Sequence, residues 1–336
     1  MENEELGYSS FFEISRVQLK LDNFSVARVI AEHKGLYKVR NMDGEYSAKI
    51  TGKQMFKASA RADYPAVGDW VAINKIDKGQ SVIEGLLSRK SALKRKFNHK
   101  NEIQIIATNV DVAFVVESVD SDFSINRFER YLAMANDSGI KPVIILNKID
   151  LISREELESK LTQIKNRLDN TDIITTSTVT DTGLEELKEY IEKGKTHCFL
   201  GSSGVGKSSL INKLIGEDLI KTGDISAYSN KGKHTTTSRE MYFLKNGGIV
   251  IDNPGMREVG IVDMDTGISG VFDEISIIAQ KCKYSDCAHE KEPECMVLQA
   301  VKSGEINRSQ LSNYINLKKE AEQYEITETE KKRKRS

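Results

Sequence analysis

The chain has 336 residues, of which 39% are hydrophobic and 29% are charged, and its formal net charge is −1. That length corresponds to about two domains, and the composition excludes a wholly disordered or fibrous protein. No apolar run approaches the ~18 residues of a membrane helix, and the acidic start Met-Glu-Asn-Glu-Glu lacks a charged-then-apolar leader, so we expect a cytoplasmic protein with no membrane partner.

Short strands separated by turn residues follow an N-terminal extension, residues 1–20. The apolar runs at 26–31, 36–39, 46–50 and 67–73 alternate with turn signals at Lys34-Gly35 and Asp43-Gly44. Many short strands at this spacing predict a small closed β-barrel of the oligonucleotide-binding (OB) type within residues 21–100. An SH3-like barrel is the alternative, because periodicity alone does not separate the two.

Basic residues gather in two places despite the balanced net charge. Residues 89–100 contain Arg89, Lys90, Lys94, Arg95, Lys96 and Lys100 without an acidic residue, and the charged tail, 326–336, ends in Lys331-Lys332-Arg333-Lys334-Arg335. Either segment could bind phosphates of RNA. The alternative for both is a solvated linker and a solvated tail.

Strands alternate with helices between residues 101 and 270. Apolar strands are predicted at 111–116, 143–146, 173–176 and 197–200, with helices at 128–135, 155–168 and 184–192. Strands that are apolar on both faces predict a mostly parallel sheet covered on both sides by helices. A hairpin at 241–244 and 249–251 follows, and residues 271–325 are predicted to form a helical module with an amphipathic helix at 306–324.

A phosphate-binding loop is the strongest local motif. Gly201-Ser202-Ser203-Gly204-Val205-Gly206-Lys207-Ser208, continued by Ser209, lies between the strand at 197–200 and a predicted helix, as the P-loop pattern requires. Its glycines allow backbone N–H groups to cradle phosphates at a helix N-terminus. Lys207 is expected to reach the β- and γ-phosphates, and Ser208 to ligate Mg²⁺.

A guanine-binding motif follows the strand at 143–146. In Asn147-Lys148-Ile149-Asp150, the Asp150 carboxylate can accept both N1–H and N2–H of guanine, which adenine does not offer. The Asn147 amide can face the other edge of the base, and the Lys148 stem can cover the ring. Ser177-Thr178 is a candidate loop for guanine O6. An exposed turn is the alternative for each motif taken alone.

Two further segments fit the Mg²⁺ and γ-phosphate side of a nucleotide site. Asp252-Asn253-Pro254-Gly255 follows a strand, so that Asp252 can hold Mg²⁺ through water and the Gly255 N–H can meet the γ-phosphate. Lys231-Gly232-Lys233-His234-Thr235-Thr236-Thr237 is a candidate switch loop. Thr235 and Thr236 are its candidate Mg²⁺ ligands and catalytic residues, beside Lys207.

The order of these motifs is rotated relative to ordinary GTPases. The guanine motif precedes the P-loop, which precedes the Thr-rich loop and then Asp252. This order indicates a circular permutation, which a sheet can survive because domain termini often lie close together. In the permuted order, the switch region is followed directly by the C-terminal module.

That module contains a metal-ligand pattern. Cys282, Cys287, His289 and Cys295 have the spacing Cys-x₄-Cys-x-His-x₅-Cys, and three thiolates with one imidazole make a closed, structural zinc site. Free buried cysteines with an incidental histidine are the alternative. Cys198 stands apart in a strand and is expected to pack in the core.

Together these features resemble the ribosome small-subunit-dependent GTPase family (RsgA, also called YjeQ) over residues 24–324. The resemblance implies a multidomain α/β protein with an OB barrel, a permuted GTPase domain and a helical zinc module. It also implies binding of GTP and GDP with Mg²⁺, one structural zinc, and contacts with the small ribosomal subunit and its rRNA during late subunit maturation. GTP hydrolysis would be stimulated by the subunit. The Lys331–Arg335 tail lies outside the family pattern, and we expect a monomer.

Met256 predicts slow hydrolysis by the free protein. It occupies the position where many GTPases carry a water-orienting Gln, and the resemblance points to His234 as the replacement, with an exposed loop histidine as the alternative.

Two other classes of function compete with a ribosomal GTPase. A zinc-containing RNA-binding protein with a barely hydrolytic, regulatory GTP site is opposed by the intact Lys207 and Ser208. A nucleotide-dependent metabolic enzyme would need a substrate pocket in addition to the GTPase motifs.

Overall fold

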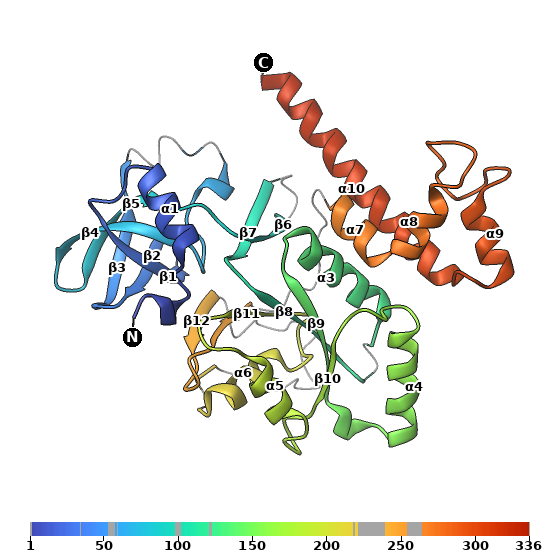
Figure 1. Ribbon diagram of the computed structural model, residues 1–336, viewed down its shortest axis with the longest axis horizontal. Coiled ribbons are helices and arrows are strands. Elements are labelled where there is room, and N and C mark those ends of the chain that lie inside the picture. Colours follow the sequence, from blue (N-terminus) through green and yellow to red (C-terminus); the bar gives the residue numbers. More distant parts are fainter. Residues whose placement is uncertain are drawn as a thin grey trace, which may run out of the picture.

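The computed structural model describes residues 2–33, 35–52, 58, 60–97, 102–120, 123–217, 219–220, 239–253 and 264–335. Figure 1 shows a β-barrel at the left, an α/β domain in the centre and a group of helices at the right, from which the last helix projects. None of the helices in the described ranges is both long and apolar enough to span a bilayer.

The N-terminal extension is folded, which the sequence did not predict. It forms the 3₁₀ helix η1 (Glu4–Leu6) and helix α1 (Ser10–Gln18). Leu6 and Phe12 are buried against Trp70 and Leu87 of the barrel region, and the two aromatic rings lie 5.9 Å apart. The extension therefore adds a small core of its own.

The predicted barrel is confirmed, and its strand order is that of an OB-fold. Its elements are β1 (Ser25–His33), β2 (Leu36–Asn41), β3 (Gly44–Ile50), η2 (Arg61–Asp63), β4 (Trp70–Asp77) and β5 (Gln80–Leu86). The order β1-β2-β3-β5-β4, with β4 paired back to β1, closes the sheet. The parallel β3–β5 pair requires a Greek-key connection.

The basic stretch after the barrel contributes a strand. Strands β6 (Ala92–Phe97) and β7 (Glu102–Thr108) form an antiparallel sheet of their own, between the barrel and the α/β domain in Figure 1. Arg89, which we had included in a phosphate-binding segment, is instead used internally. Its guanidinium forms a bidentate pair with the buried Asp69 carboxylate, with N–O distances of 2.8 and 2.7 Å.

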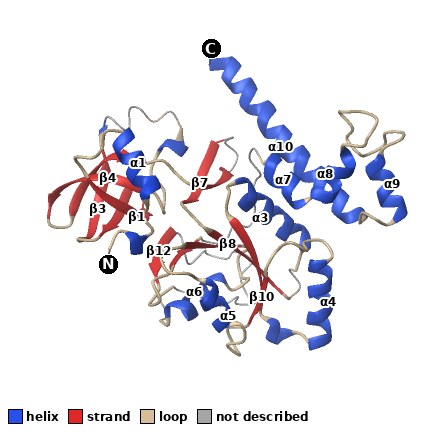
Figure 2. Ribbon diagram, viewed as in Figure 1, coloured by secondary structure: helices blue, strands red, loops and turns tan. Residues whose placement is uncertain are grey.

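The central domain has the predicted parallel sheet. Strands β8 (Val112–Ser118), β9 (Lys141–Asn147), β10 (Ile173–Thr176), β11 (Thr196–Leu200) and β13 (Ile249–Asp252) lie in the order β10-β9-β8-β11-β13. The hairpin partner β12 (Arg239–Phe243) is antiparallel to β13. Figure 2 shows the helices around these strands: α3 (Ile125–Asp137), α4 (Arg154–Lys165), α5 (Leu184–Tyr190) and α6 (Lys207–Ile215). The 3₁₀ helix η3 (Ile149–Leu151) follows β9.

Alternate residues of each strand enter different cores. Ala113 and Val115 of β8 pack with α3 and the C-terminal helices, whereas Phe114 and Val116 pack with α5 and α6. Because both faces are covered, the strands are continuously apolar, which is why their pattern was readable in the sequence.

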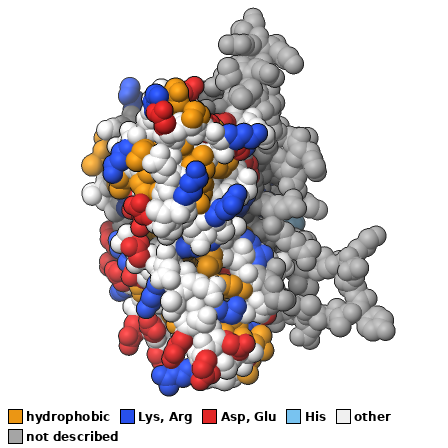
Figure 3. All heavy atoms as spheres, turned by 90° about the vertical axis from the view of Figure 1, so that its right-hand side faces the viewer, with side chains coloured by type: hydrophobic (Ala, Val, Ile, Leu, Met, Phe, Trp, Pro, Cys, Tyr) orange, Lys and Arg blue, Asp and Glu red, His pale blue; other side chains and the backbone are white. Residues whose placement is uncertain are grey.

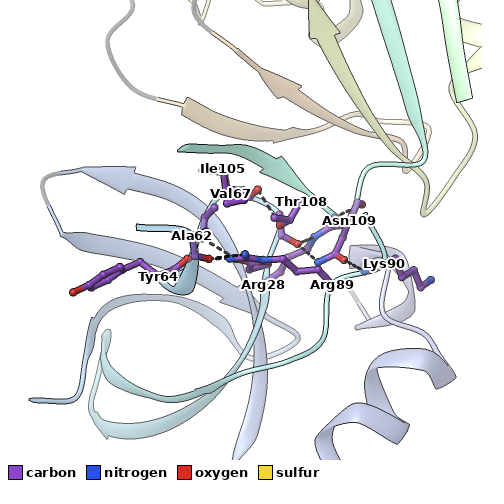
Figure 4. Close-up of polar contacts among 12 residues, drawn as sticks. Arg28, Ala62, Tyr64, Val67, Arg89, Lys90, Ile105, Thr108 and Asn109 are labelled. Atoms are coloured by element: carbon purple, nitrogen blue, oxygen red, sulfur yellow. Dashed lines mark hydrogen bonds and ion pairs between the residues drawn. The ribbon is translucent and has the colours of Figure 1, made fainter. Parts of the chain in front are cut away.

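The barrel and the central sheet are joined. Strand β1 pairs with β12, so that Ala31 lies opposite Glu240 and Glu32 opposite Arg239. Arg28, only 1% exposed, donates to the carbonyls of Leu6, Gly68 and Asn109 and to Thr196 Oγ1; Figure 4 shows Arg28 beside Thr108 and Asn109. One sheet of 11 strands therefore runs through both domains.

The C-terminal module is helical, as predicted. It contains α7 (Asp265–Val271), α8 (Asp273–Ala279), α9 (Met296–Ser303) and the long α10 (Arg308–Arg335). Buried Glu129 of α3 accepts from Asn313 of α10 and from Arg167, which fixes α10 on the central domain. The face seen in Figure 3 carries both acidic and basic side chains, with the acidic ones gathered mainly in its lower part.

Candidate functional site

The nucleotide-site candidates converge at one edge of the parallel sheet. The carboxyl ends of β8, β9, β10, β11 and β13 carry Asp120, Asn147, Ser177, Gly201 and Asp252 respectively. Ligands of open parallel sheets bind at this edge. The permuted sequence order thus places the predicted motifs side by side in space.

The P-loop begins with a glycine that cannot be replaced. Gly201 has a φ of +145°, and a Cβ there would lie 2.2 Å from the Val116 carbonyl oxygen of the neighbouring strand. The loop turns sharply after β11 and enters α6 at Lys207. Its backbone N–H groups are therefore gathered at the helix N-terminus, the arrangement that binds phosphate. Ser203 and Gly204 are exposed at the tip, and Ser208 and Ser209 are half-buried.

Asn147 ties the guanine motif to the P-loop. Its fully buried amide donates to the Val205 carbonyl at 2.8 Å and accepts from Thr176 Oγ1 at 2.9 Å. Gly206, with a φ of +98°, passes so close that a Cβ would lie 2.3 Å from Asn147 Nδ2. The amide that we expected to face the base therefore holds three strand ends together.

Lys207 and Asp252 are opposite charges buried in the same site. The Lys207 ammonium donates to the carbonyls of Gly201 and Ser202 at 2.9 and 2.6 Å, and burial lowers its pKa to about 8. Burial raises the pKa of Asp252 to about 6, against the opposing effects of Lys207 and Ser208. Neither Asp252 oxygen has a hydrogen-bond partner among the described residues. The carboxylate is thus suited to a cation or its bound water.

The base-binding candidates lie beside this cradle. Asp150 is exposed, and its Oδ1 accepts from Ser177 Oγ at 2.5 Å. The same hydroxyl accepts from the backbone N–H groups of Val179 and Thr180, so Ser177 orders its loop as well as Asp150, with Thr178 half-buried beside it. The Lys148 ammonium is held by Asp120 at 3.0 Å.

Three supporting residues were not predicted from the sequence. Asp120 orients Lys148, Thr176 orients Asn147, and Tyr131 of α3, whose pKa burial raises to about 12, reaches Ser202 of the P-loop. Asp120 follows an apolar strand, which is the signal that could have found it. Tyr131 offers no such signal, because its side chain meets the P-loop only through tertiary packing.

Part of the predicted site lies outside the described residues. These predictions are His234, Thr235 and Thr236 of the Thr-rich loop, together with Gly255 and Met256. They stay predictions.

The Cys-His cluster has the dimensions of a tetrahedral metal site. Its ligand atoms all lie within 4.8 Å of one another, and Cys282 Sγ lies 3.7 Å from His289 Nδ1 and 3.8 Å from Cys295 Sγ. His289 Nδ1 and Cys295 Sγ are 3.4 Å apart. A tetrahedral zinc ion with Zn–S of about 2.3 Å and Zn–N of about 2.0 Å separates its ligands by about 3.5–3.8 Å.

The loop that carries these ligands is also ordered by hydrogen bonds that do not involve the four ligand side chains. The Glu292 carboxylate accepts from the backbone N–H groups of Ala288, Glu290 and Lys291. Its own backbone N–H, followed by these three groups, lowers the pKa of Glu292 to about 2. Cys295 caps α9 by accepting from the Leu298 N–H at 3.4 Å. His289 has a φ of +59°, a strained conformation that metal coordination would offset.

Comparison with protein families gives two matches. Residues 86–262 match the RsgA GTPase family, and residues 196–332 match the family described as 50S ribosome-binding GTPase.

Similar proteins cover most of the chain. A small ribosomal subunit biogenesis GTPase RsgA 2 from Lactiplantibacillus plantarum is 43% identical over 88% of this chain and 83% of its own length. A protein of the same description, RsgA 1, from Bacteroides thetaiotaomicron is 39% identical over 93% and 87%. The crystal structure of YjeQ from Thermotoga maritima is 29% identical with a TM-score of 0.63, covering 87% of this chain and 96% of that one. YloQ, described as a circularly permuted GTPase, shares the fold at 24% identity and a TM-score of 0.62, over 89% and 96%.

Proposed function

The chain belongs to the RsgA family of circularly permuted GTPases, and from this premise we propose that it hydrolyses GTP on the small ribosomal subunit and acts in the late maturation of that subunit. Relatives that match most of this chain are described as small ribosomal subunit biogenesis GTPases. The protein would work in the cytoplasm as a monomer.

The observation that carries the proposal is the junction at Asn147. Its amide bonds to the P-loop through Val205 and to the Ser177 loop through Thr176. The P-loop and the Asn147–Asp150 motif are thereby held at a fixed separation, which is what recognition of a whole guanine nucleotide would require. A protein that had lost nucleotide binding would have no need to bury this amide.

The residues divide the work of hydrolysis. The Lys207 ammonium, held over the P-loop by two carbonyls, would exchange these bonds for β- and γ-phosphate oxygens. Ser208 and Asp252 would hold Mg²⁺, which neutralises phosphate charge when bound. We assign Thr235 and Thr236 to closing the site over the metal, Gly255 to the γ-phosphate, and His234 to positioning the attacking water in place of the Gln that Met256 replaces.

The Cys-His cluster would hold one structural zinc ion. Its donor set and its ligand separations fit tetrahedral coordination, and four protein ligands leave no position open for chemistry. The ion would fix the loop between α8 and α9 and thereby the surface that the helical module presents to RNA.

Purified small subunits provide the test. Steady-state GTP hydrolysis should be slow for the free protein and should rise strongly when subunits are added. Added salt should weaken that stimulation, because phosphate contacts dominate binding to RNA. Equal rates with and without subunits would refute the proposal.

A further inference from the structure

A cavity of about 240 Å³ lies where the barrel meets the β6–β7 hairpin. Its walls include Glu32 and Tyr37 from the barrel, Arg61 and Tyr64 from the η2 segment, and Gln104 from β7. At ~30 Å³ for each water, the volume corresponds to about eight waters, which exceeds the space needed by a single phosphate group.

One wall of the cavity is held in place by the internal ion pair described above. Arg89 donates to the carbonyls of Ala62 and Tyr64 at 2.8 and 2.9 Å while it pairs with Asp69. Figure 4 shows these contacts and the Tyr64 ring extending away from them. These bonds to the carbonyls of Ala62 and Tyr64 hold the segment that carries Arg61 and Tyr64 in place.

Two more arginines adjoin this wall. Arg95 of β6 donates to Gln104 Oε1 at 3.0 Å, and Arg239, the first residue of β12, lies against the Ile105 carbonyl at 3.5 Å. Burial, together with the charges of Arg95 and Arg61, lowers the pKa of Arg239 to about 10. Burial likewise lowers the pKa of Arg95, with a contribution from Arg61.

Among the residues that the structure describes, Glu32 is the acidic group that acts on Arg239. Glu32 lies opposite Arg239 in the β1–β12 register and favours its charged form, but neither Arg95 nor Arg239 forms an ion pair with a described residue. Partly buried like charges are costly to a fold unless something of opposite charge compensates them. Guanidinium groups match phosphate oxygens in a bidentate geometry.

We propose that Arg61, Arg95 and Arg239 bind a phosphodiester of single-stranded RNA, with an adjoining base in the cavity against Tyr64. RNA is favoured over a free anion because the cavity offers an aromatic wall and more room than one phosphate fills. The inference rests on the proposed function for the identity of the RNA, which would belong to the small subunit.

Arg239 connects this RNA site to the proposed nucleotide site. The next residue, Glu240, pairs with Asp252 across the β12–β13 ladder, and β12 begins where the segment 221–238 ends. A phosphate on Arg239 would fix the start of β12 and, through this strand pairing, the position of Asp252. Arg239 is thus also a positioning residue.

Binding of the full-length protein to a fluorescein-labelled single-stranded RNA of about 12 nucleotides tests the site. Arg95→Gln and Arg239→Gln should each weaken binding about tenfold near 0.1 M salt and lower the salt slope by about 1. Arg239→Lys should restore the salt dependence of RNA binding but only part of the affinity. Lysine keeps the positive charge but lacks the planar guanidinium that can donate two parallel hydrogen bonds to a phosphate. Arg154→Gln, the same change at an exposed site on α4, is the matched control and should bind as wild type.

Thermal unfolding separates binding from a structural role. If Arg239 serves a ligand, Arg239→Gln should unfold at the wild-type temperature or above it, because an uncompensated charge has been removed. A lowered temperature with unchanged RNA affinity would overturn the proposal, as would wild-type affinity and slope in both glutamine variants.

Inorganic phosphate distinguishes the source of the ligand. Stabilisation of wild type but not of Arg239→Gln by about 10 mM phosphate, with RNA binding unaffected, would assign the site to a free anion and overturn the RNA assignment. If small subunits stimulate GTP hydrolysis by both glutamine variants at the concentration that stimulates the wild type, this RNA site alone is refuted. If small subunits do not stimulate the wild-type protein, the proposed function is refuted.

Discussion

Replacing Asp150 with Asn should cost GTP affinity without harming the fold. The carboxylate is exposed and accepts from Ser177 Oγ, and the Asn carbonyl can accept the same bond, so the loop should keep its conformation. What is lost is a charged acceptor for guanine N1–H and N2–H. Hydrogen bonds to charged groups contribute about 1.5–3 kcal/mol, so affinity should fall about 10- to 100-fold.

Competition between nucleotides gives the sharpest readout of Asp150→Asn. Xanthine carries a carbonyl where guanine carries its 2-amino group, and the Asn amide can donate to it, so XTP should gain affinity as GTP loses it. Equilibrium binding of a fluorescent GTP analogue, displaced by GTP or XTP, measures both. Asp169→Asn, an exposed residue before β10 at the opposite edge of the sheet, is the control. Unchanged GTP affinity in Asp150→Asn, or an equal loss in the control, would refute base recognition by Asp150.

Three further changes test the other parts of the site. Asn147→Ala leaves two buried polar partners unsatisfied at ~1–3 kcal/mol each, so urea unfolding should show a loss of about 2–6 kcal/mol together with weaker GTP binding; a loss below about 0.5 kcal/mol would contradict the bridging role. Cys287→Ser should lose its zinc by metal analysis, whereas Cys198→Ser, in the buried core strand β11, should keep it; full metal in Cys287→Ser would exclude the assigned ligand set. His234→Ala should lose most of the subunit-stimulated hydrolysis while GTP affinity stays within about twofold, and a fully stimulated variant would exclude only that histidine.

Local motifs account for what the sequence predicted well. The strand Ile173–Thr176 and the start of α6 at Lys207 agree with the structure, because each follows from a continuous apolar run or a glycine-rich turn. The Cys-His cluster was found because its four ligands fall within one short window. Features of this kind depend on neighbours in the chain, which a single sequence displays.

Features that depend on distant partners were missed. Helix α1 leaves Ile14 57% exposed while burying Phe12 against Trp70, so its apolar pattern did not mark one buried face. Arg89 looked like part of a basic RNA-binding segment, yet its carboxylate partner, Asp69, comes from another part of the chain. Charge counting finds a basic stretch, but it does not reveal which of its members are neutralised by the fold.

Because β1 pairs with β12, part of β1 stays unpaired during synthesis until β12 has been made. Residues 31–32 leave the ribosome about 200 residues before their partners at 239–240, a delay of about 10–40 s at ~5–20 residues per second. During that time the barrel can close through β4, but the far end of β1 has an uncovered edge, and Arg28 lacks Thr196 as an acceptor. Uncovered strand edges recruit foreign strands. The nascent barrel therefore depends on the completion of the α/β domain for protection against mispairing.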